Sequence, residues 1–279
     1  PEAGVALGHR RLAILDLSPE GHQPMASRSG RYVIAYNGEV YNFAALRTEL
    51  ETSGGQFHSR SDTEVVVEAI DQWGIDHALD RFIGMFAFAL WDRKDRVLTL
   101  ARDRLGIKPV FWGHASGTFV FGSELRALTC HPGFARDLDT DAATLFALRG
   151  CVPAPRSIYR DAHKLEPGTR LSYAVDTGEH TITRFWSLLH TAEHGIAHPF
   201  RGDRRDAANE LDHLLQNAVT YSALGEQHLR VLARRPVARG FKFVDTDTRL
   251  IWRAVALGLG PLLVALFGLL WGRTRRAAA

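Results

Sequence analysis

The sequence predicts an α+β fold in which antiparallel sheets are covered by helices. Short apolar runs stand on either side of polar turns such as 93–96 and 176–178, which is the pattern of β-hairpins. Segments with apolar residues at helical spacing lie between these runs. The hydrophobic fraction of 46% and the charged fraction of 23% are ordinary for a globular protein. Hairpins mixed with helices favour sheets that bury one face against helices.

The expected strands begin with two buried apolar runs and continue as hairpins around short turns. The second run ends at the pair Asn37-Gly38. In chain order, the expected strands are 5–16, 32–36, 85–91, 97–101, 109–112, 118–121, 169–175 and 181–186.

Helical spacing marks residues 42–50, with the first residue as the expected N-cap. The next helix, 63–73, is capped by Ser61 or Asp62, and with Ser61 as the cap Glu64 occupies the capping-box position. The remaining helices are expected at 124–129, 141–148 and 206–223, and residues 187–205, rich in His, Arg and Gly, are expected to form a linker.

Composition narrows the class of protein. A length of 279 residues allows one large domain or two small ones. The net charge of +3 comes from scattered arginines, so nucleic-acid binding is not expected. Cys130 and Cys151 are the two cysteines, which excludes a disulfide scaffold and fits a reducing, cytoplasmic compartment. Their spacing is not that of zinc ligands, so no metal site is expected.

The pair Asn37-Gly38 follows the apolar run 32–36 and has two interpretations. An asparagine amide beside an unhindered glycine N–H is the donor pair that stabilises the oxyanion of a tetrahedral acyl intermediate. The same dipeptide is also the commonest tight turn. The pair alone does not decide between an oxyanion hole and a plain turn.

Motifs elsewhere in the chain favour the first interpretation. In their order and spacing they resemble the glutaminase domain of glutamine-hydrolysing asparagine synthetases, which is a class II glutamine amidotransferase. The resemblance runs from about Gly4 to Trp186. The motifs are GHRRLAILD (8–16), YNGEVYN (36–42), SRSDTEVV (59–66), GMFAFALWD (84–92), ARDRLGIKPVFW (101–112) and FGSELRAL (121–128).

The resemblance implies a four-layer αββα sandwich of the N-terminal nucleophile hydrolase type over residues 1–186. Residues 187–224 would then be a linker and the first helix of a truncated synthetase domain, and 225–279 an unrelated tail. In the intact family member, ammonia from L-glutamine amidates aspartate with ATP and Mg²⁺, and such proteins can be homodimers. This chain lacks the family's SGGxDS loop for ATP, so no cofactor is expected in it.

The resemblance also implies a binding site for the glutamine zwitterion. Asn37 and the Gly38 N–H would form the oxyanion hole. Arg11 would bind the α-carboxylate, Glu39 and Asp62 would receive the α-ammonium, and backbone groups of Ile14 and Leu15 would complete the site. Singly, each charged residue has a plainer interpretation: the arginine as a surface ion pair, the aspartate as a helix cap, the glutamate as a solvated strand end.

The family's nucleophile is an N-terminal cysteine whose own α-amine is the base, and the chain begins instead at Pro1. We therefore expect an N-terminally truncated domain that binds glutamine weakly without turning it over. Cys130 and Cys151 are expected to be structural, and His9 is expected to pack rather than to catalyse. The loop 102–109 is expected to be an ordered turn that supports the site, with phosphate binding as the alternative.

The segment 254–272 carries no charged residue and would span about 28 Å as a helix. Arginines flank it, and Trp252 and Trp271 stand where interfacial aromatics lie in membrane proteins. A transmembrane helix is expected, with a buried core helix as the alternative. The chain is thus expected to be an asparagine synthetase fragment with a foreign tail. The alternatives are a membrane-anchored ligand-binding or accessory protein, and a class II amidotransferase with another acceptor.

Overall fold

The computed structural model describes residues 4–10 and 21–212. The chain divides into the units Pro1–Ala207 and Ala208–Ala279, and the elements below belong to the first. The strands are β1 (Met25–Ala26), β2 (Tyr32–Val40), β3 (Gly84–Asp92), β4 (Val97–Arg102), β5 (Phe111–Ala115), β6 (Thr118–Gly122), β7 (Ala162–Lys164), β8 (Thr169–Ala174) and β9 (His180–Arg184). The helices are α1 (Phe43–Thr52), α2 (Asp62–Trp73), α3 (Ile75–Arg81), α4 (Leu125–Thr129), α5 (Thr140–Arg149) and α6 (Leu188–Ala197).

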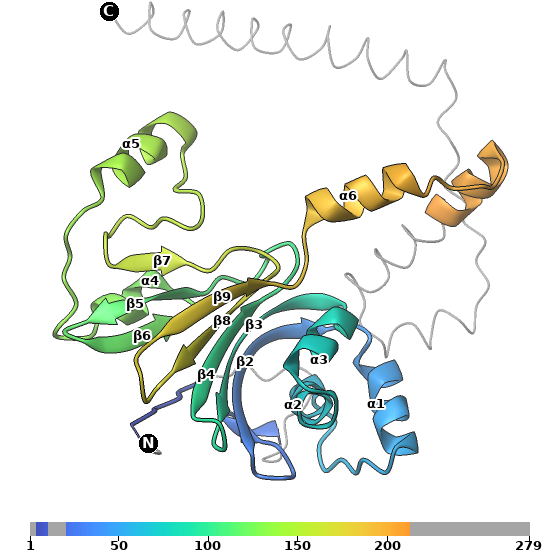
Figure 1. Cartoon of the computed structure of the whole chain (residues 1–279), viewed down its shortest axis with the longest axis horizontal. Helices are drawn as coiled ribbons and strands as arrows, with labels where there is room; N and C mark the ends of the chain where they lie inside the picture. The colour runs from blue at the N-terminus through green and yellow to red at the C-terminus, as the bar shows by residue number, and fades with distance from the viewer. Residues whose placement is uncertain (1–3, 11–20, 213–279) are drawn as a thin grey trace, which may run out of the picture. The chain divides into compact units, whose positions relative to one another are not determined.

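The larger sheet has six strands in the order β1-β2-β3-β4-β8-β9, and its neighbouring strands are antiparallel. Helices α1, α2 and α3 lie together beside β2 (Figure 1). Apolar side chains of these helices and of β2 and β3 form one core cluster, in which Ile34, Val66 and Ile70 are fully buried. Burial of this kind contributes about 1.5–3 kcal/mol per large apolar side chain.

The smaller sheet has three strands in the order β6-β5-β7. Its Trp112 joins Leu100 and Leu171 of the larger sheet in a second core cluster, so the two sheets pack against each other. A third cluster, which includes Ala115 and Leu128, joins the smaller sheet to α4. The order is therefore helices, sheet, sheet and helix, and an α+β architecture agrees with the sequence prediction.

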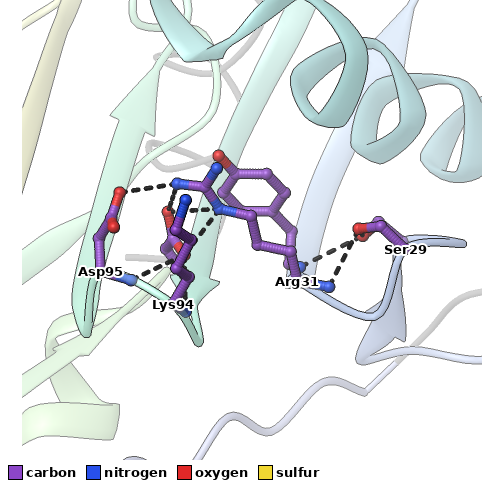
Figure 2. A network of polar contacts seen from close by, with 7 residues as sticks. Ser29, Arg31, Lys94 and Asp95 are labelled. Carbon is purple, nitrogen blue, oxygen red and sulfur yellow. Dashed lines mark hydrogen bonds and ion pairs between the residues drawn. The ribbon is translucent and has the colours of Figure 1, made fainter.

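An ion-pair network ties the turn before β2 to the hairpin turn between β3 and β4 (Figure 2). The Arg31 guanidinium donates to Asp92 at 2.6 Å and to Asp95 at 2.7 Å, and it lies over the Tyr32 ring. The Asp92 carboxylate also accepts from the backbone N–H groups of Lys94 and Asp95. The network fixes the end of β2 that is far from the Asn37-Gly38 pair.

Several predicted elements need correction. The strand expected over 5–16 is not formed at residues 6–10, and 11–20 lie outside the described residues. The strand 32–36 was predicted too short, because β2 continues to Val40 along β3. The region 187–205 was predicted as a linker and contains α6. Residues 204–212 are helical, and the remainder of the helix expected at 206–223 lies outside the described part. The prediction omitted three elements, β1, β7 and α3.

The fold prediction is wrong where it added a transmembrane helix. Within residues 4–10 and 21–212, no helix combines the length and the hydropathy needed to cross a bilayer. The segment for which the helix was predicted, 254–272, lies outside the described residues.

Candidate functional site

The pair Asn37-Gly38 lies inside a strand rather than in a turn. Asn37 faces Ala87 and Gly38 faces Phe86 in the β2–β3 register. A Cβ atom at position 38 would stand 2.2 Å from the Met85 carbonyl oxygen, so β3 leaves no room for a side chain there. The plain-turn interpretation is therefore wrong, and glycine is required by the close approach of the neighbouring strand.

Side chains of β2 alternate between the two faces of the sheet. Ile34, Tyr36 and Val40 are buried on the face covered by α1, α2 and α3. Asn37 and Glu39 fall on the alternate positions and are half-buried. The two predicted polar residues therefore share one face of β2, and the buried Tyr36 points to the other.

The backbone N–H of Gly38 points to the outer edge of β2, away from β3. Phe86, which faces it, donates its N–H to the Asp103 carboxylate at 3.2 Å and accepts from the Asp103 N–H at 2.8 Å. Residues directly opposite in an antiparallel pair exchange both bonds or neither. Because Phe86 uses its groups on the β4 side, the Gly38 groups face the other way.

Two side chains occupy the neighbouring N–H groups on this outer edge. The Tyr36 N–H donates to Gln23 Oε1 at 2.6 Å, and the Val40 N–H donates to Asp62 Oδ2 at 3.2 Å. Between them, the Gly38 N–H has no hydrogen-bond partner among the described residues. A donor that no described residue uses thus lies between two donors that are in use.

Helix α2 brings Asp62 to this edge. Ser61 is the N-cap, with its hydroxyl accepting from the Thr63 N–H at 3.2 Å, so the cap role falls to the serine and not to Asp62. Glu64, expected to reach back to the cap, binds the N–H groups of His58 and Ser59 instead. Asp62 therefore starts the helix with its carboxylate turned toward β2.

The Asp62 carboxylate is only 5% exposed. Its Oδ2 accepts from the Tyr36 hydroxyl at 2.9 Å as well as from the Val40 N–H. Burial raises the pKa of Asp62, and the hydrogen bonds from Val40, Tyr36 and Thr63 oppose that rise. Burial and the neighbouring Asp62 charge raise the pKa of the Tyr36 hydroxyl well above its usual range.

The charge of Asp62 also affects the pKa of Glu39. Burial raises the pKa of Glu39, the nearby Asp62 carboxylate raises it further, and Lys108 lowers it. Glu39 is therefore neither remote from Asp62 nor a solvated strand end. This part of β2 thus carries the Asp62 carboxylate on its edge, Glu39 within the electrostatic influence of Asp62, and an N–H donor that no described residue uses. Such a set of groups can bind a cationic amine together with a hydrogen-bond acceptor.

The loop 102–109 lies beside the site, and side chains of the loop itself hydrogen-bond to its backbone. The buried Asp103 carboxylate accepts from the N–H groups of Leu105, Ile107 and Lys108 at 2.9–3.1 Å. The half-buried Arg102 guanidinium donates to the carbonyls of Gly106, Lys108 and Leu165. The loop is the ordered turn that the sequence predicted. The phosphate alternative is disfavoured, because these N–H groups are already bound to a carboxylate.

The remaining predicted residues are not brought to the site. Arg11, Ile14 and Leu15 lie outside the described residues, so their predicted roles stay predictions. Cys130 is the exposed C-cap of α4, and Cys151 is exposed just after α5. No cluster of metal-ligating side chains occurs within the described ranges 4–10 and 21–212.

Sequence reasoning missed Gln23 and Tyr36. Gln23 Oε1 binds the edge of β2, and its Nε2 donates to Thr63 Oγ1 at 3.2 Å, so its buried amide links β2 to α2. Neither partner is near Gln23 in the sequence, and no local pattern marks this contact. Tyr36 belongs to the YNGE motif, but its position at the end of the apolar run 32–36 is that of an aromatic residue of the core.

Comparison with known proteins finds a family whose model matches this chain and several similar proteins. The sequence profile of a family described as "Glutamine amidotransferase domain" matches residues 1–186. An asparagine synthetase [glutamine-hydrolyzing] 3 of Bacillus subtilis (strain 168) is 38% identical over 190 residues, covering 67% of this chain and 30% of that protein. A putative asparagine synthetase [glutamine-hydrolyzing] 2 of Methanocaldococcus jannaschii is 35% identical over 202 residues, covering 66% of this chain and 38% of that protein.

The chain thus spans about a third of the length of the curated relatives it matches. Among solved structures, a glutamine phosphoribosylpyrophosphate amidotransferase from B. subtilis is similar with a TM-score of 0.43. That similarity covers 60% of this chain and 32% of the other at 23% identity, which is too distant a likeness to identify the fold by itself.

Proposed function

Because this chain belongs to the glutamine amidotransferase domain family, we propose that the edge of β2 binds L-glutamine and prepares its side-chain carboxamide for hydrolysis. The domain is homologous to that of glutamine-hydrolysing asparagine synthetases. One structural observation carries the assignment to this edge. Among the described residues the Gly38 N–H has no partner, and it lies between two occupied donors on the strand edge that Asp62 contacts.

In the proposed site each group of glutamine meets a group of opposite character. Glu39 and Asp62 receive the α-ammonium, and Arg11 binds the α-carboxylate. Attack on the carboxamide carbon moves negative charge onto its oxygen, which then accepts from the Gly38 N–H and the Asn37 amide. Loss of one such donor typically costs about 3 kcal/mol of transition-state stabilisation.

The cysteines of this chain are not assigned a catalytic role. Cys130 and Cys151 are exposed at the ends of α4 and α5, and neither element carries a proposed glutamine-binding residue. We assign the described residues to substrate binding and to oxyanion stabilisation.

For the whole protein we propose the reaction of its relatives. The released ammonia would amidate aspartate in a domain that uses ATP and Mg²⁺. This proposal rests on the names of homologues that are about three times longer than the match, and the glutamine site is the part that this chain can test.

Calorimetric titration of the full chain with L-glutamine tests the site. We expect saturable binding of L-glutamine, and Asp62→Asn should weaken it about 10- to 100-fold, because a hydrogen bond to a charged group contributes about 1.5–3 kcal/mol. The variant keeps an acceptor for Tyr36 and Val40, removes the charge and replaces the second oxygen by an NH2 donor. The matched control, Asp95→Asn, changes an exposed aspartate of the hairpin turn and should bind normally. Equal affinity in all three proteins would contradict the assignment.

A further inference from the structure

The buried Tyr36 hydroxyl has no role in the glutamine site proposed above. It is directed from the helix-covered face of β2 to the carboxylate of Asp62, and the Tyr36 side chain is only 2% exposed. A phenol on a core face normally contributes packing, and its hydroxyl then finds a partner to offset desolvation. Here that partner is one of the two carboxylates proposed to receive the ammonium of glutamine.

We propose that Tyr36 is a positioning residue, which holds the Asp62 carboxylate in the orientation that receives the α-ammonium of glutamine. The inference rests on the proposed function of the β2 edge. The hydroxyl and the Val40 N–H both donate to the same oxygen, Oδ2, at 2.9 and 3.2 Å. Two donors on Oδ2 restrict the rotation of the carboxylate and so fix the direction in which it faces an added cation.

The surroundings of Tyr36 make this orientation rigid. The Tyr36 N–H is bound by Gln23 Oε1 at 2.6 Å, and Gln23 Nε2 donates to Thr63, the residue after Asp62. Tyr36 therefore meets the first turn of α2 in two ways, through its own hydroxyl and through the amide of Gln23. Strand and helix cannot shift along each other without breaking a buried hydrogen bond.

Position along the strand adds a second constraint. Tyr36 and Val40 are each two residues from Gly38, or about 7 Å along the strand. The two residues that donate to Asp62 therefore stand on either side of Gly38 in the strand. A ligand bound through both the ammonium and the carboxamide needs these two contacts at a fixed separation, which the Tyr36–Asp62 bond maintains.

The same hydrogen bond bears on the charge of Asp62. Donation from Tyr36 lowers the pKa of Asp62 against the effect of burial. Burial and the Asp62 charge in turn raise the pKa of Glu39, and Lys108 lowers it. Without the hydroxyl, the carboxylate should accept a proton at a higher pH and lose its attraction for an ammonium.

The test compares two ligands in three forms of the full chain. L-Glutamine carries the α-ammonium, and glutaramic acid has the same carboxylate and carboxamide without it. Tyr36→Phe removes only the hydroxyl. We expect its affinity for L-glutamine to fall about 5- to 10-fold, with the affinity for glutaramic acid unchanged. The matched control, Tyr32→Phe, removes a hydroxyl from the same face of the same strand near Asp92 and should leave both affinities unchanged.

A purely structural role predicts a different result. In that case Tyr36→Phe would lower the affinity for both ligands equally, or lower only the melting temperature, and the inference would be overturned. A pH series gives a second measurement. The acidic limit of L-glutamine binding should move to higher pH in Tyr36→Phe, and an unmoved limit would count against the inference.

The outcomes separate this inference from the proposed function. If the unmodified chain does not bind L-glutamine, the proposed function fails and the inference fails with it. If the unmodified chain prefers L-glutamine to glutaramic acid and Tyr36→Phe keeps the same preference, the glutamine site stands and the role of Tyr36 is refuted.

Discussion

Asp62 and Asp103 are both buried aspartates next to the β2–β3 pair, but their surroundings differ. Asp103 is fully buried and accepts from the N–H groups of four residues: Phe86, Leu105, Ile107 and Lys108. Asp62 is 5% exposed and receives a hydroxyl and an N–H on the same oxygen. The Asp103 carboxylate is enclosed by backbone donors and holds a loop in place, whereas the Asp62 carboxylate joins β2 to the first turn of α2 beside the proposed ligand site. Burial alone does not distinguish a structural aspartate from a functional one.

The largest expected effect is on Asp103. Asp103→Ala would leave four N–H groups without their acceptor, the buried one of Phe86 and the three part-buried ones of the loop. An orphaned buried donor costs about 1–3 kcal/mol. We expect the free energy of unfolding, measured by urea denaturation, to fall by about 4 kcal/mol or more. The control Asp95→Ala changes an exposed aspartate and should cost less than about 1 kcal/mol. Similar losses in the two variants would show that Asp103 does not hold the loop in place.

The next effect concerns Gly106 in the Asp103 loop. Its φ is +66°, and a Cβ would stand 2.7 Å from Pro167 Cγ and 3.0 Å from Arg102 Cζ. Gly117 also has a positive φ, +79°, but no atom lies within 4 Å of its Cβ position. Gly117→Ala should cost about 1 kcal/mol from backbone strain. Gly106→Ala should cost about 1–3 kcal/mol more, from crowding against packed atoms. Denaturation curves for both variants measure the difference in the free energy of unfolding. Equal losses would show that the loop rearranges to accommodate the added methyl group.

A smaller effect is expected at the start of α2. Ser61→Ala removes the hydroxyl that accepts from the Thr63 N–H. Loss of such a cap costs about 1 kcal/mol. The melting temperature should fall slightly, and the affinity for L-glutamine should fall only if the cap also holds Asp62 in place. Thr48→Ala, which removes an exposed hydroxyl within α1, is the control and should not lower the melting temperature.

The smallest effect has the opposite sign. The pKa of Asp62 is raised in the folded protein, so protonation favours folding and the charged form costs stability at neutral pH. Asp62→Asn should therefore be at least as stable as the unmodified chain at pH 7. Its advantage should shrink as the pH falls through the raised pKa, and should level off below the ordinary aspartate value of about 3.9. Unfolding free energies at several pH values provide the measurement. An advantage that grows toward acid pH would contradict the sign of the shift.

Local signals in the sequence predicted the elements whose ends depend on near neighbours. Ser61 caps α2, and Gly74 ends it in a backbone conformation with φ +79°. The hairpin at Ser116-Gly117 forms as expected, with both residues at positive φ. These residues interact mainly with positions two to four away, so the pattern of a short window contains the necessary information.

The edge of β2 could not be predicted in the same way. Its strand continues past Asn37-Gly38 because β3 pairs with it from almost fifty positions away, and tertiary pairing overrides the turn preference of the dipeptide. Gln23, Asp62 and Asp103 reach this region from three other segments. The resemblance to a family selected Asn37, Gly38, Glu39 and Asp62, but which donors near them are occupied depends on the folded arrangement of distant segments.

The order of strands in the larger sheet has a consequence for how this domain is completed. Strand β4 ends at Arg102, and its other neighbour, β8, begins only at Thr169. All strands of the smaller sheet therefore lie, in the sequence, between two strands that are neighbours in the larger sheet. During folding, one apolar edge of β4 stays unpaired until β8 pairs with it. Long-range closure of this kind is slow, and an open edge of buried-type residues is a template for aggregation. A chain shortened before β8 would present that edge to other copies of itself.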